Sequence, residues 1–314
     1  MCQGLESYAL VHPFGLSSAT TTRQFGMGGP VSCVWDEGFA NPAFAAMQTR
    51  PNAAIRVGAT RFDHGPSLTS GQLHFALPLR PNESGLQLSV FSMHSSAGMT
   101  ALPQVGAVAA KLSEDDISLQ YGRRLSPRLA AGIGVSPAST IRLRITTPTG
   151  VPILDVKATP DYGARVGLVY AYGEPQRGDN VGLVCDYYQE TAKATGFAVG
   201  GAAHGVFYTD LFALGACRHV RPDLLLVGEY QRGSSHSGQI DNAIQGWHIG
   251  GEYQCNRQLA LRAGLNQGHA SYGAGYVSDR WQVAYAYINR WNDSVANPLF
   301  GSSDTHQLQA TCAW

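Results

Sequence analysis

Charged residues are scarce in this sequence. Only 14% of its 314 residues are Asp, Glu, Lys or Arg, against about 25% in a typical globular protein. Three of these are lysines: Lys111, Lys157 and Lys193. A soluble surface of this size normally carries more charge. The 22 basic residues balance the 22 acidic ones, which argues against nucleic acid as a partner.

Long apolar runs are missing too. No stretch approaches the roughly 20 apolar residues of a membrane-spanning helix. Residues 1–16 lack a basic region followed by a long apolar stretch, so they do not resemble a signal peptide. The N-terminus therefore fits a cytosolic protein or a mature chain that begins with a start Met, and a lipidated Cys2 is a further alternative.

Closely spaced cysteine pairs are absent. No C-x-x-C motif is present, so zinc, iron–sulfur and haem sites have no local support, and we predict no metal and no other cofactor. Four of the cysteines fall in or directly after strand-like segments, where we expect them to pack as small apolar residues rather than as disulfides. The six are Cys2, Cys33, Cys185, Cys217, Cys255 and Cys312.

What the sequence does have, from residue 54 onward, is alternation. In residues 281–288, for example, Trp281, Val283, Tyr285 and Tyr287 share one face of an extended chain. Turn-forming residues separate such segments, and several segments are long enough to cross a bilayer when tilted. We predict strands near 54–62, 72–79, 86–93, 117–124, 129–136, 141–147, 151–158, 163–172, 181–190, 195–203, 207–217, 224–232, 246–254, 258–266, 270–277, 281–289 and 305–314.

The two faces of these segments distinguish a membrane barrel from a soluble sandwich. The apolar faces end in aromatic residues, as interfacial girdles do: Tyr170, Tyr172, Tyr187, Tyr253, Trp281 and Tyr287. The opposite faces combine small residues with charges that we expect to point into a lumen: Arg56, Arg142, Arg144, Arg165, Glu229, Glu252 and Arg262. We therefore predict an all-β transmembrane antiparallel β-barrel of about 14 strands (range roughly 12–16). A soluble sandwich with its apolar faces inward is the alternative.

The lumen charges allow two interpretations. Buried charges must be paired, so they could form an internal salt-bridge network that fills the lumen. Alternatively, the arginines could line a path for an anionic substrate or an ion.

Residues 1–53 differ from the rest and we expect them to form a separate N-terminal segment. Pro42 favours a short helix over Ala43–Met47. The glycines, Asp36 and the Asn-Pro-Ala sequence together resemble the N-terminal signature of the FadL-type outer-membrane barrels, a group that includes PorV-like and TraF-like relatives. The matching residues are Gly26, Gly28, Gly29, Asp36, Asn41, Pro42 and Ala43. Pro30 and Glu37 depart from that signature, and the chain is short for a long-chain transporter.

The resemblance implies a function as well as a fold. It implies that residues 1–53 are a hatch that plugs the barrel formed by 54–314. It also implies passive, porin-like uptake of hydrophobic small molecules across the outer membrane of a Gram-negative bacterium, with a lateral exit at an interrupted strand, for which Pro78 and Pro137 are candidates. A non-transporting scaffold for secreted or surface proteins is the alternative.

The C-terminus carries a further signal. Its last strand alternates and ends in an aromatic residue, which resembles the signal that the outer-membrane assembly machinery reads. The residues concerned are Leu308, Ala310, Cys312 and Trp314. We therefore expect outer-membrane lipid and the assembly machinery among the partners.

Catalysis is not expected, although an outer-membrane hydrolase remains a third hypothesis. The candidates are Ser235 beside His236, His248 with Glu252 on one strand face, and His74. No G-x-S-x-G or H-E-x-x-H motif is present.

Overall fold

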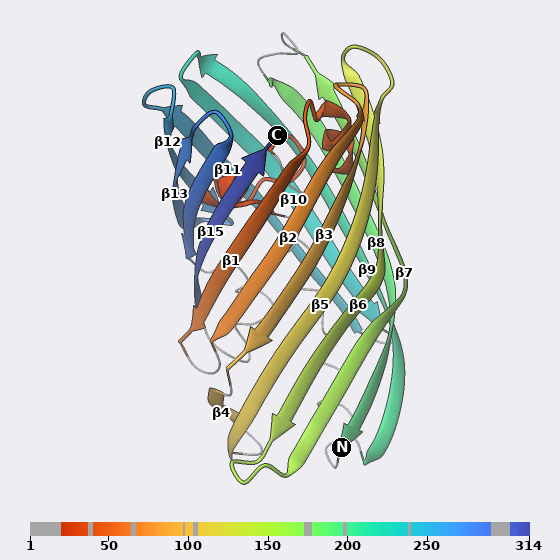
Figure 1. The fold of residues 1–314 in the computed structure, drawn as a ribbon. Coiled ribbons are helices and arrows are strands. Elements are labelled where there is room, and N and C mark those ends of the chain that lie inside the picture. The colour runs from red at the N-terminus through yellow and green to blue at the C-terminus, as the bar shows by residue number, and fades with distance from the viewer. Residues whose placement is uncertain are drawn as a thin grey trace.

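The computed structural model describes residues 20–36, 40–63, 67–96, 98–102, 106–172, 178–196, 200–237, 240–289 and 302–314. Within these ranges the chain is almost entirely β-sheet (Figure 1). The strands are β1 (Asn52–Phe62), β2 (Leu68–Arg80), β3 (Ser84–Ser95), β4 (Gly98–Leu102), β5 (Gly106–Arg124), β6 (Leu129–Thr146), β7 (Pro152–Ala171), β8 (Asn180–Gly196), β9 (Gly201–Arg221), β10 (Leu224–Ser237), β11 (Ile240–Gln254), β12 (Leu259–Asn266), β13 (His269–Val277), β14 (Trp281–Asn289) and β15 (Ser303–Ala313).

The strands close into an antiparallel barrel. Strands that follow one another in sequence pair, except β3 and β4; β3 pairs with β5 instead, and β1 pairs with β15. The short β4 pairs only with β5 and lies outside this ring, which leaves 14 strands in the closed barrel. The predicted barrel of about 14 strands is confirmed. No helix among the described residues is long and apolar enough to cross a membrane.

The barrel has two unlike rims. At one, which we call the short-turn rim, tight turns such as 81–83 and 222–223 join the strands, and β1 begins where β15 ends. The opposite rim, which we call the far rim, is uneven because β5–β9 contain 17 to 21 residues whereas β12–β14 contain 8 or 9. The long strands project beyond the others, toward the bottom of Figure 1.

The outer wall is apolar over most of its height. Exposed Leu, Val, Ile, Tyr and Trp side chains alternate with buried small or polar ones, as in β14, where Trp281 is 58% exposed and Ala286 is buried. A continuous apolar exterior is the surface that a barrel presents to lipid. The soluble sandwich, which needs its apolar faces inside, is therefore wrong.

The polarity of the wall inverts in the projecting strands. Near the middle of β5, Ile117 and Leu119 face outward, but toward the far rim Val108 and Leu112 face inward while Lys111 is exposed. A wall that leaves the bilayer for water should exchange its faces in this way, because apolar side chains are then more stable inside.

This inversion explains where strand prediction failed. Segments 129–136 and 141–147 were expected to be two strands but are one, β6, and segments 151–158 and 163–172 are both parts of β7. The sequence alternation breaks at the inversion although the backbone continues. The predicted strand 195–203 is also wrong, because it spans the end of β8 and the start of β9.

Among the described residues before β1, there are two short helices. The predicted helix at 43–47 is confirmed as the 3-10 helix η2 (Pro42–Met47), with Pro42 in its first turn and the Asn41 side chain accepting from Ala43 N at 3.0 Å. A second helix, α2 (Thr22–Gly26), was not predicted, and Thr21 and Gln24 cap its start reciprocally.

Candidate functional site

The segment before β1 lies inside the barrel near the short-turn rim (Figure 1). We call residues 20–36 and 40–51 the hatch segment. Helix α2 contacts β12–β15 on one side, and η2 contacts β2, β3, β5, β6 and β7 on the other. The hatch segment therefore crosses the lumen from wall to wall. Strand β1 begins at Asn52, two residues before the boundary predicted at 53/54.

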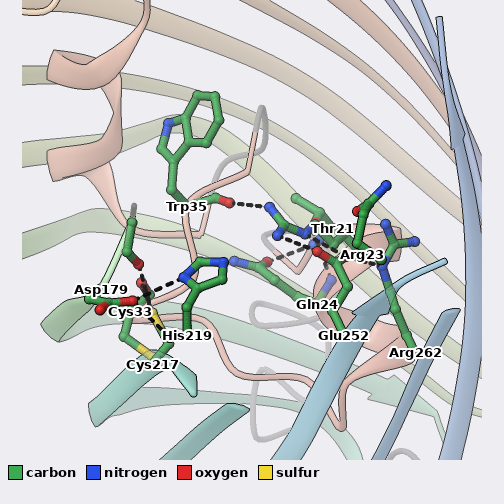
Figure 2. A network of polar contacts seen from close by, with 12 residues as sticks. Thr21, Arg23, Gln24, Cys33, Trp35, Asp179, Cys217, His219, Glu252 and Arg262 are labelled. Carbon is green, nitrogen blue, oxygen red and sulfur yellow. Dashed lines mark hydrogen bonds and ion pairs between the residues drawn. The ribbon is translucent and has the colours of Figure 1, made fainter. Parts of the chain in front are cut away.

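An ionic cluster attaches α2 to the wall (Figure 2). Arg23 donates from Nε and Nη2 to the two carboxylate oxygens of Glu252 at 2.9 and 2.7 Å, and Arg262 donates from Nε to Glu252 at 2.6 Å. Arg23 also donates to the carbonyl of Trp35 at 2.7 Å. Burial alone would lower the pKa of Arg23, but the charge of Glu252 and the hydrogen bonds to it outweigh burial and raise this pKa. Arg23 is therefore held as a cation.

A second carboxylate receives the hatch backbone. Glu229, which is fully buried on β10, accepts from Val31 N at 2.8 Å, Ser32 N at 2.7 Å and Ser32 Oγ at 2.5 Å. Gln231 donates to Glu229 at 2.6 Å and to Gly29 O at 3.0 Å. Four donors therefore converge on this one carboxyl group, which makes Glu229 a principal contact between hatch segment and wall.

Asn41 joins both halves of the hatch segment to the wall. Its side-chain nitrogen donates to Ser32 O at 2.7 Å and to the carbonyls of Leu168 at 3.2 Å and Leu183 at 3.3 Å. The predicted motif residues on either side are also engaged. Gly28 O bonds Nδ1 of His248 at 2.7 Å, and Asp36 is buried. Gly28 and Gly29 both have φ of 88°, a conformation that only glycine adopts readily.

Glycines on the wall make room for the hatch segment. A side chain at Gly182 would meet the carbonyl of Ser32, one at Gly167 would meet Asn41, and one at Gly132 would meet Pro42. Gly250 and Gly264 similarly face the Met27 backbone. The sequence pattern of small inward residues was interpreted only as a crowded interior. Their concentration at one level of the barrel was the signal that a docked segment lies there.

Two further inward arginines lie on other strands. Arg165 forms a bidentate pair with Asp186 at 2.7 and 2.5 Å, and both are buried. Arg56 donates to Thr20 O, and the buried His74 lies on the neighbouring strand. His248 and Glu252, considered together from the sequence, bind different parts of the hatch segment and not one another.

Two predicted lumen charges, Arg142 and Arg144, are on the outer wall instead. Their side chains are 52% and 47% exposed, and Arg142 forms a bidentate pair with Asp155 at 2.9 and 2.6 Å. The prediction was wrong because it assumed that the apolar face of 141–145 meets lipid. This part of β6 projects beyond the apolar belt, so Ile141 and Leu143 point inward and the arginines outward.

Cys33 and Cys217 lie against one another where the hatch segment meets β9 (Figure 2). Both are free and buried, and Cys217 Sγ donates to Cys33 O at 3.2 Å. Burial raises the pKa of the Cys33 thiol, and the thiolate is the reactive form. For Cys217, which falls in the predicted strand 207–217, this agrees with the expected apolar packing.

The burial of Cys33 predicts its reactivity. In the folded protein we expect Cys33 to react with a maleimide at least about tenfold more slowly than Cys255, which is exposed in a turn. Labelling followed by peptide mass spectrometry measures both rates in one sample. Equal rates would show that the hatch segment does not stay docked.

An apolar surface lines the interior at the far rim. We call it the apolar lining, and it consists of buried side chains from β1–β3 and β5–β8: Phe62, Leu68, Phe91, Met93, Val108, Ala110, Leu112, Ile141, Leu143, Ile145, Ile153, Leu154, Ala158 and Ala192. Phe207 of β9 packs against it. The sequence did not predict this surface, because Ile141 and Leu143 were expected to face lipid, and Val108 and Leu112 fell outside the predicted strands.

The wall is interrupted next to this lining, on the side toward the short-turn rim. Strands β6 and β7 pair up to Val135↔Ala164 and again from Ile141↔Ala158. Between these points, residues 136–140 of β6 and 159–163 of β7 do not pair with one another. Pro137 and Pro160, which lack an N–H, lie in these stretches. Gly163 leaves space that the ring of Tyr188 fills. The other candidate, Pro78, adjoins a register shift between β2 and β3.

A cavity of about 400 Å³ lies between the hatch segment and the short-turn rim. Its lining combines Trp35 and Met47 with the cations Arg23, Arg124 and Arg128. The hatch segment therefore packs less tightly against the β5–β6 turn than against β10–β12.

Serine–histidine pairs occur on the outer wall but are poorly arranged for catalysis. Ser92 Oγ lies 2.9 Å from His94 Nε2 but donates to Asp115 at 2.7 Å, and Ser234 Oγ lies 3.2 Å from His236 Nε2 but donates to Asp210 at 2.6 Å. A nucleophilic serine needs to donate to the histidine. Residues 238–239 and the side chain of Ser235 lie outside the described residues. In the described part of the chain, no group of three or more His, Cys, Asp or Glu residues could hold a metal ion.

No protein-family model and no curated protein sequence matches the chain. Solved structures do match it. The toluene transporter TbuX of Ralstonia pickettii is similar with a TM-score of 0.67 at 14% identity, over 96% of this chain and 100% of that one. The toluene transporter TodX of Pseudomonas putida (TM-score 0.62, 15% identity, 94% and 97% covered) and a Pseudomonas aeruginosa FadL homologue (0.62, 12%, 94% and 98%) are also similar. The chain has the FadL-type barrel fold.

The FadL-type match extends over nearly the full length of both chains. Identities of 12–15% establish the fold of this FadL-type barrel and leave its substrate to be argued from its own residues.

Proposed function

We propose that this protein is an outer-membrane channel for small hydrophobic molecules, with the hatch segment as its periplasmic closure. The observation that carries the proposal is the apolar lining. A water-filled pore for polar solutes has a polar interior, whereas this interior begins with buried Phe, Leu, Ile and Met side chains at the far rim. Apolar pockets with few polar groups are typical of sites for hydrophobic ligands.

The exit that we propose is sideways through the wall. Below the lining the lumen becomes polar at Arg165 and Asp186 and is then crossed by the hatch segment. Entry of an apolar molecule into this region is unfavourable, because it would displace water from polar groups that it cannot hydrogen-bond. The unpaired stretches of β6 and β7 adjoin the lining and lead toward the lipid-facing side, where Val135 and Val166 are exposed. Similarity to two structures described as toluene transporters supports the substrate class.

The lining predicts a specific effect on binding. Leu143→Asn places an amide among apolar side chains, and we expect the purified protein to bind toluene or a similar monoaromatic at least about tenfold more weakly. Leu125→Asn, the same substitution at an exposed residue of the β5–β6 turn on the short-turn rim, is the control that should bind normally. Titration calorimetry in detergent measures both.

Folding must be checked in the same samples. A closed barrel stays compact in cold SDS and shifts on boiling, and both variants should do so. Equal affinities for the two variants, with the barrel intact, would remove the lining from the proposed pathway. A wild-type protein that binds no hydrophobic ligand would favour the alternative, a scaffold that transports nothing.

A further inference from the structure

A row of basic side chains crosses the outer wall of the projecting strands. Arg142 of β6 is directly opposite Lys157 of β7, Lys157 is opposite Lys193 of β8, and Lys193 is opposite His204 of β9. One step nearer the far rim, Lys111 of β5 is opposite Arg144. All six side chains are exposed, and we call them the basic row. It contains every lysine of the sequence.

This arrangement is costly in the protein alone. Like charges directly opposite on neighbouring strands destabilise a sheet, and the basic row contains several such pairs in succession. The acid within it is Asp155, which forms the bidentate pair with Arg142 and lies 3.9 Å from Arg144. Asp115, an outward acid of β5 nearer the short-turn rim, accepts a hydrogen bond from Ser92 instead. An anion from outside the chain would remove the repulsion.

The height of the row on the wall points to the source of that anion. On the same strands, closer to the short-turn rim, Tyr162, Tyr187 and Tyr208 are exposed as in an interfacial girdle. Lys193 is six residues beyond Tyr187 in β8, which is about 14 Å above it for a strand rising ~3.3 Å per residue at ~45° tilt. That is the zone of lipid headgroups, which adjoins the apolar belt on the side of the far rim.

We propose that the basic row binds the phosphate groups of the phosphorylated glycolipid in the outer leaflet. The basic side chains are spread side by side over five neighbouring strands, so a single free phosphate could contact only a few of them at once. A glycolipid presents several phosphates on one molecule, matches a row spread over neighbouring strands, and places its acyl chains against the apolar belt below. The inference depends on the outer-membrane location proposed above and not on transport.

The test compares two double variants of equal charge change. Lys157→Gln/Lys193→Gln removes two members of the row. Arg123→Gln/Arg218→Gln removes two exposed outward cations of β5 and β9 near the short-turn rim. Binding of purified, delipidated protein to lipopolysaccharide with a phosphorylated inner core is measured in detergent. Each basic side chain near an anionic surface contributes about fivefold in affinity, so we expect the first variant to bind roughly 30-fold more weakly. We expect the second variant to bind as wild type.

Three further results decide the proposal. Wild-type protein should bind dephosphorylated lipopolysaccharide as weakly as the lysine variant binds the phosphorylated form. Inorganic phosphate at equal phosphate concentration should not displace lipopolysaccharide from the wild-type protein. Without glycolipid, the lysine variant should unfold at the same or a higher temperature than wild type, because repulsion is removed. Equal binding by both variants, or equal loss in both, overturns the proposal. Toluene binding by the lysine variant should be unchanged, so failure here is distinguishable from failure of the channel.

Discussion

Replacing Glu252 with alanine is expected to release the hatch segment from the wall. The substitution leaves Arg23 and Arg262 without the carboxylate that binds both, and the side chain of Arg262 is only 2% exposed. Removing one partner of a buried ion pair costs about 3–5 kcal/mol because an uncompensated charge remains. Undocking lets both guanidinium groups reach water, so the cost should appear as loss of docking while the barrel stays closed.

Two measurements detect the release. Maleimide labelling of Cys33 should rise toward the rate of Cys255, and ion conductance in planar bilayers should increase because the lumen is no longer crossed. The matched control is Asp155→Ala, which also removes a carboxylate shared by two arginines, but on the exposed outer wall. Exposed pairs contribute little, so this variant should behave as wild type. Equal behaviour of the two variants would contradict the anchoring role of Glu252.

Substituting Gly182 with alanine should weaken docking by a different route. The added methyl group would meet the backbone carbonyl of Ser32, which also accepts the hydrogen bond of Asn41. Backbone cannot swing aside as a side chain can, so the hatch segment must shift. Overpacking of this kind costs about 1–3 kcal/mol, and Gly167→Ala, which meets Asn41, should add to it.

Gly228→Ala is the control for this prediction. An added methyl group at Gly228 on β10 meets nothing within 4 Å, and alanine in a strand is otherwise more stable than glycine by about 0.5–1 kcal/mol. Gly182→Ala should therefore unfold at a lower temperature and label faster at Cys33, whereas Gly228→Ala should unfold at the same or a higher temperature and label at the wild-type rate. Stabilisation by both would show that the hatch segment does not press on the wall.

Strand alternation predicted the barrel because lipid imposes one rule on every strand. Positions such as Trp281 and Ala286 in β14 obey it, with aromatic and aliphatic side chains outside and small or polar ones inside. The helix after Pro42 was predictable for a local reason, since proline fixes the first turn and Asn41 caps it. Such features depend on neighbouring residues alone.

The errors occurred where surroundings changed along one strand. Ile141 and Leu143 look lipid-facing in sequence, but β6 has left the apolar belt there, and its apolar side turns inward. The height of the membrane on the wall is set by the whole barrel and is not encoded in any one segment. The same limit hid the apolar lining and reversed the placement of Arg142 and Arg144.

Partner choice inside the lumen was also beyond the sequence. Glu229, Glu252 and Arg262 could be assigned to inward faces by alternation. That Glu229 receives the backbone of Ser32, nearly two hundred residues away, depends on how the hatch segment crosses the barrel. The roles of Leu308 and Trp314 in assembly remain predictions; Leu308 is exposed on β15, and Trp314 is exposed directly after this strand.

The most direct test of the channel is uptake by intact cells of a Gram-negative host that expresses the protein. Cells are offered labelled toluene and, separately, a labelled polar solute of similar size, and initial rates are compared with those of cells lacking the protein. We expect faster entry of toluene and unchanged entry of the polar solute, because the pathway is apolar at the far rim and the hatch segment crosses the lumen near the short-turn rim. Equal acceleration of both solutes would indicate an open aqueous pore, and acceleration of neither would indicate a barrel that transports nothing; either result would contradict the proposed function.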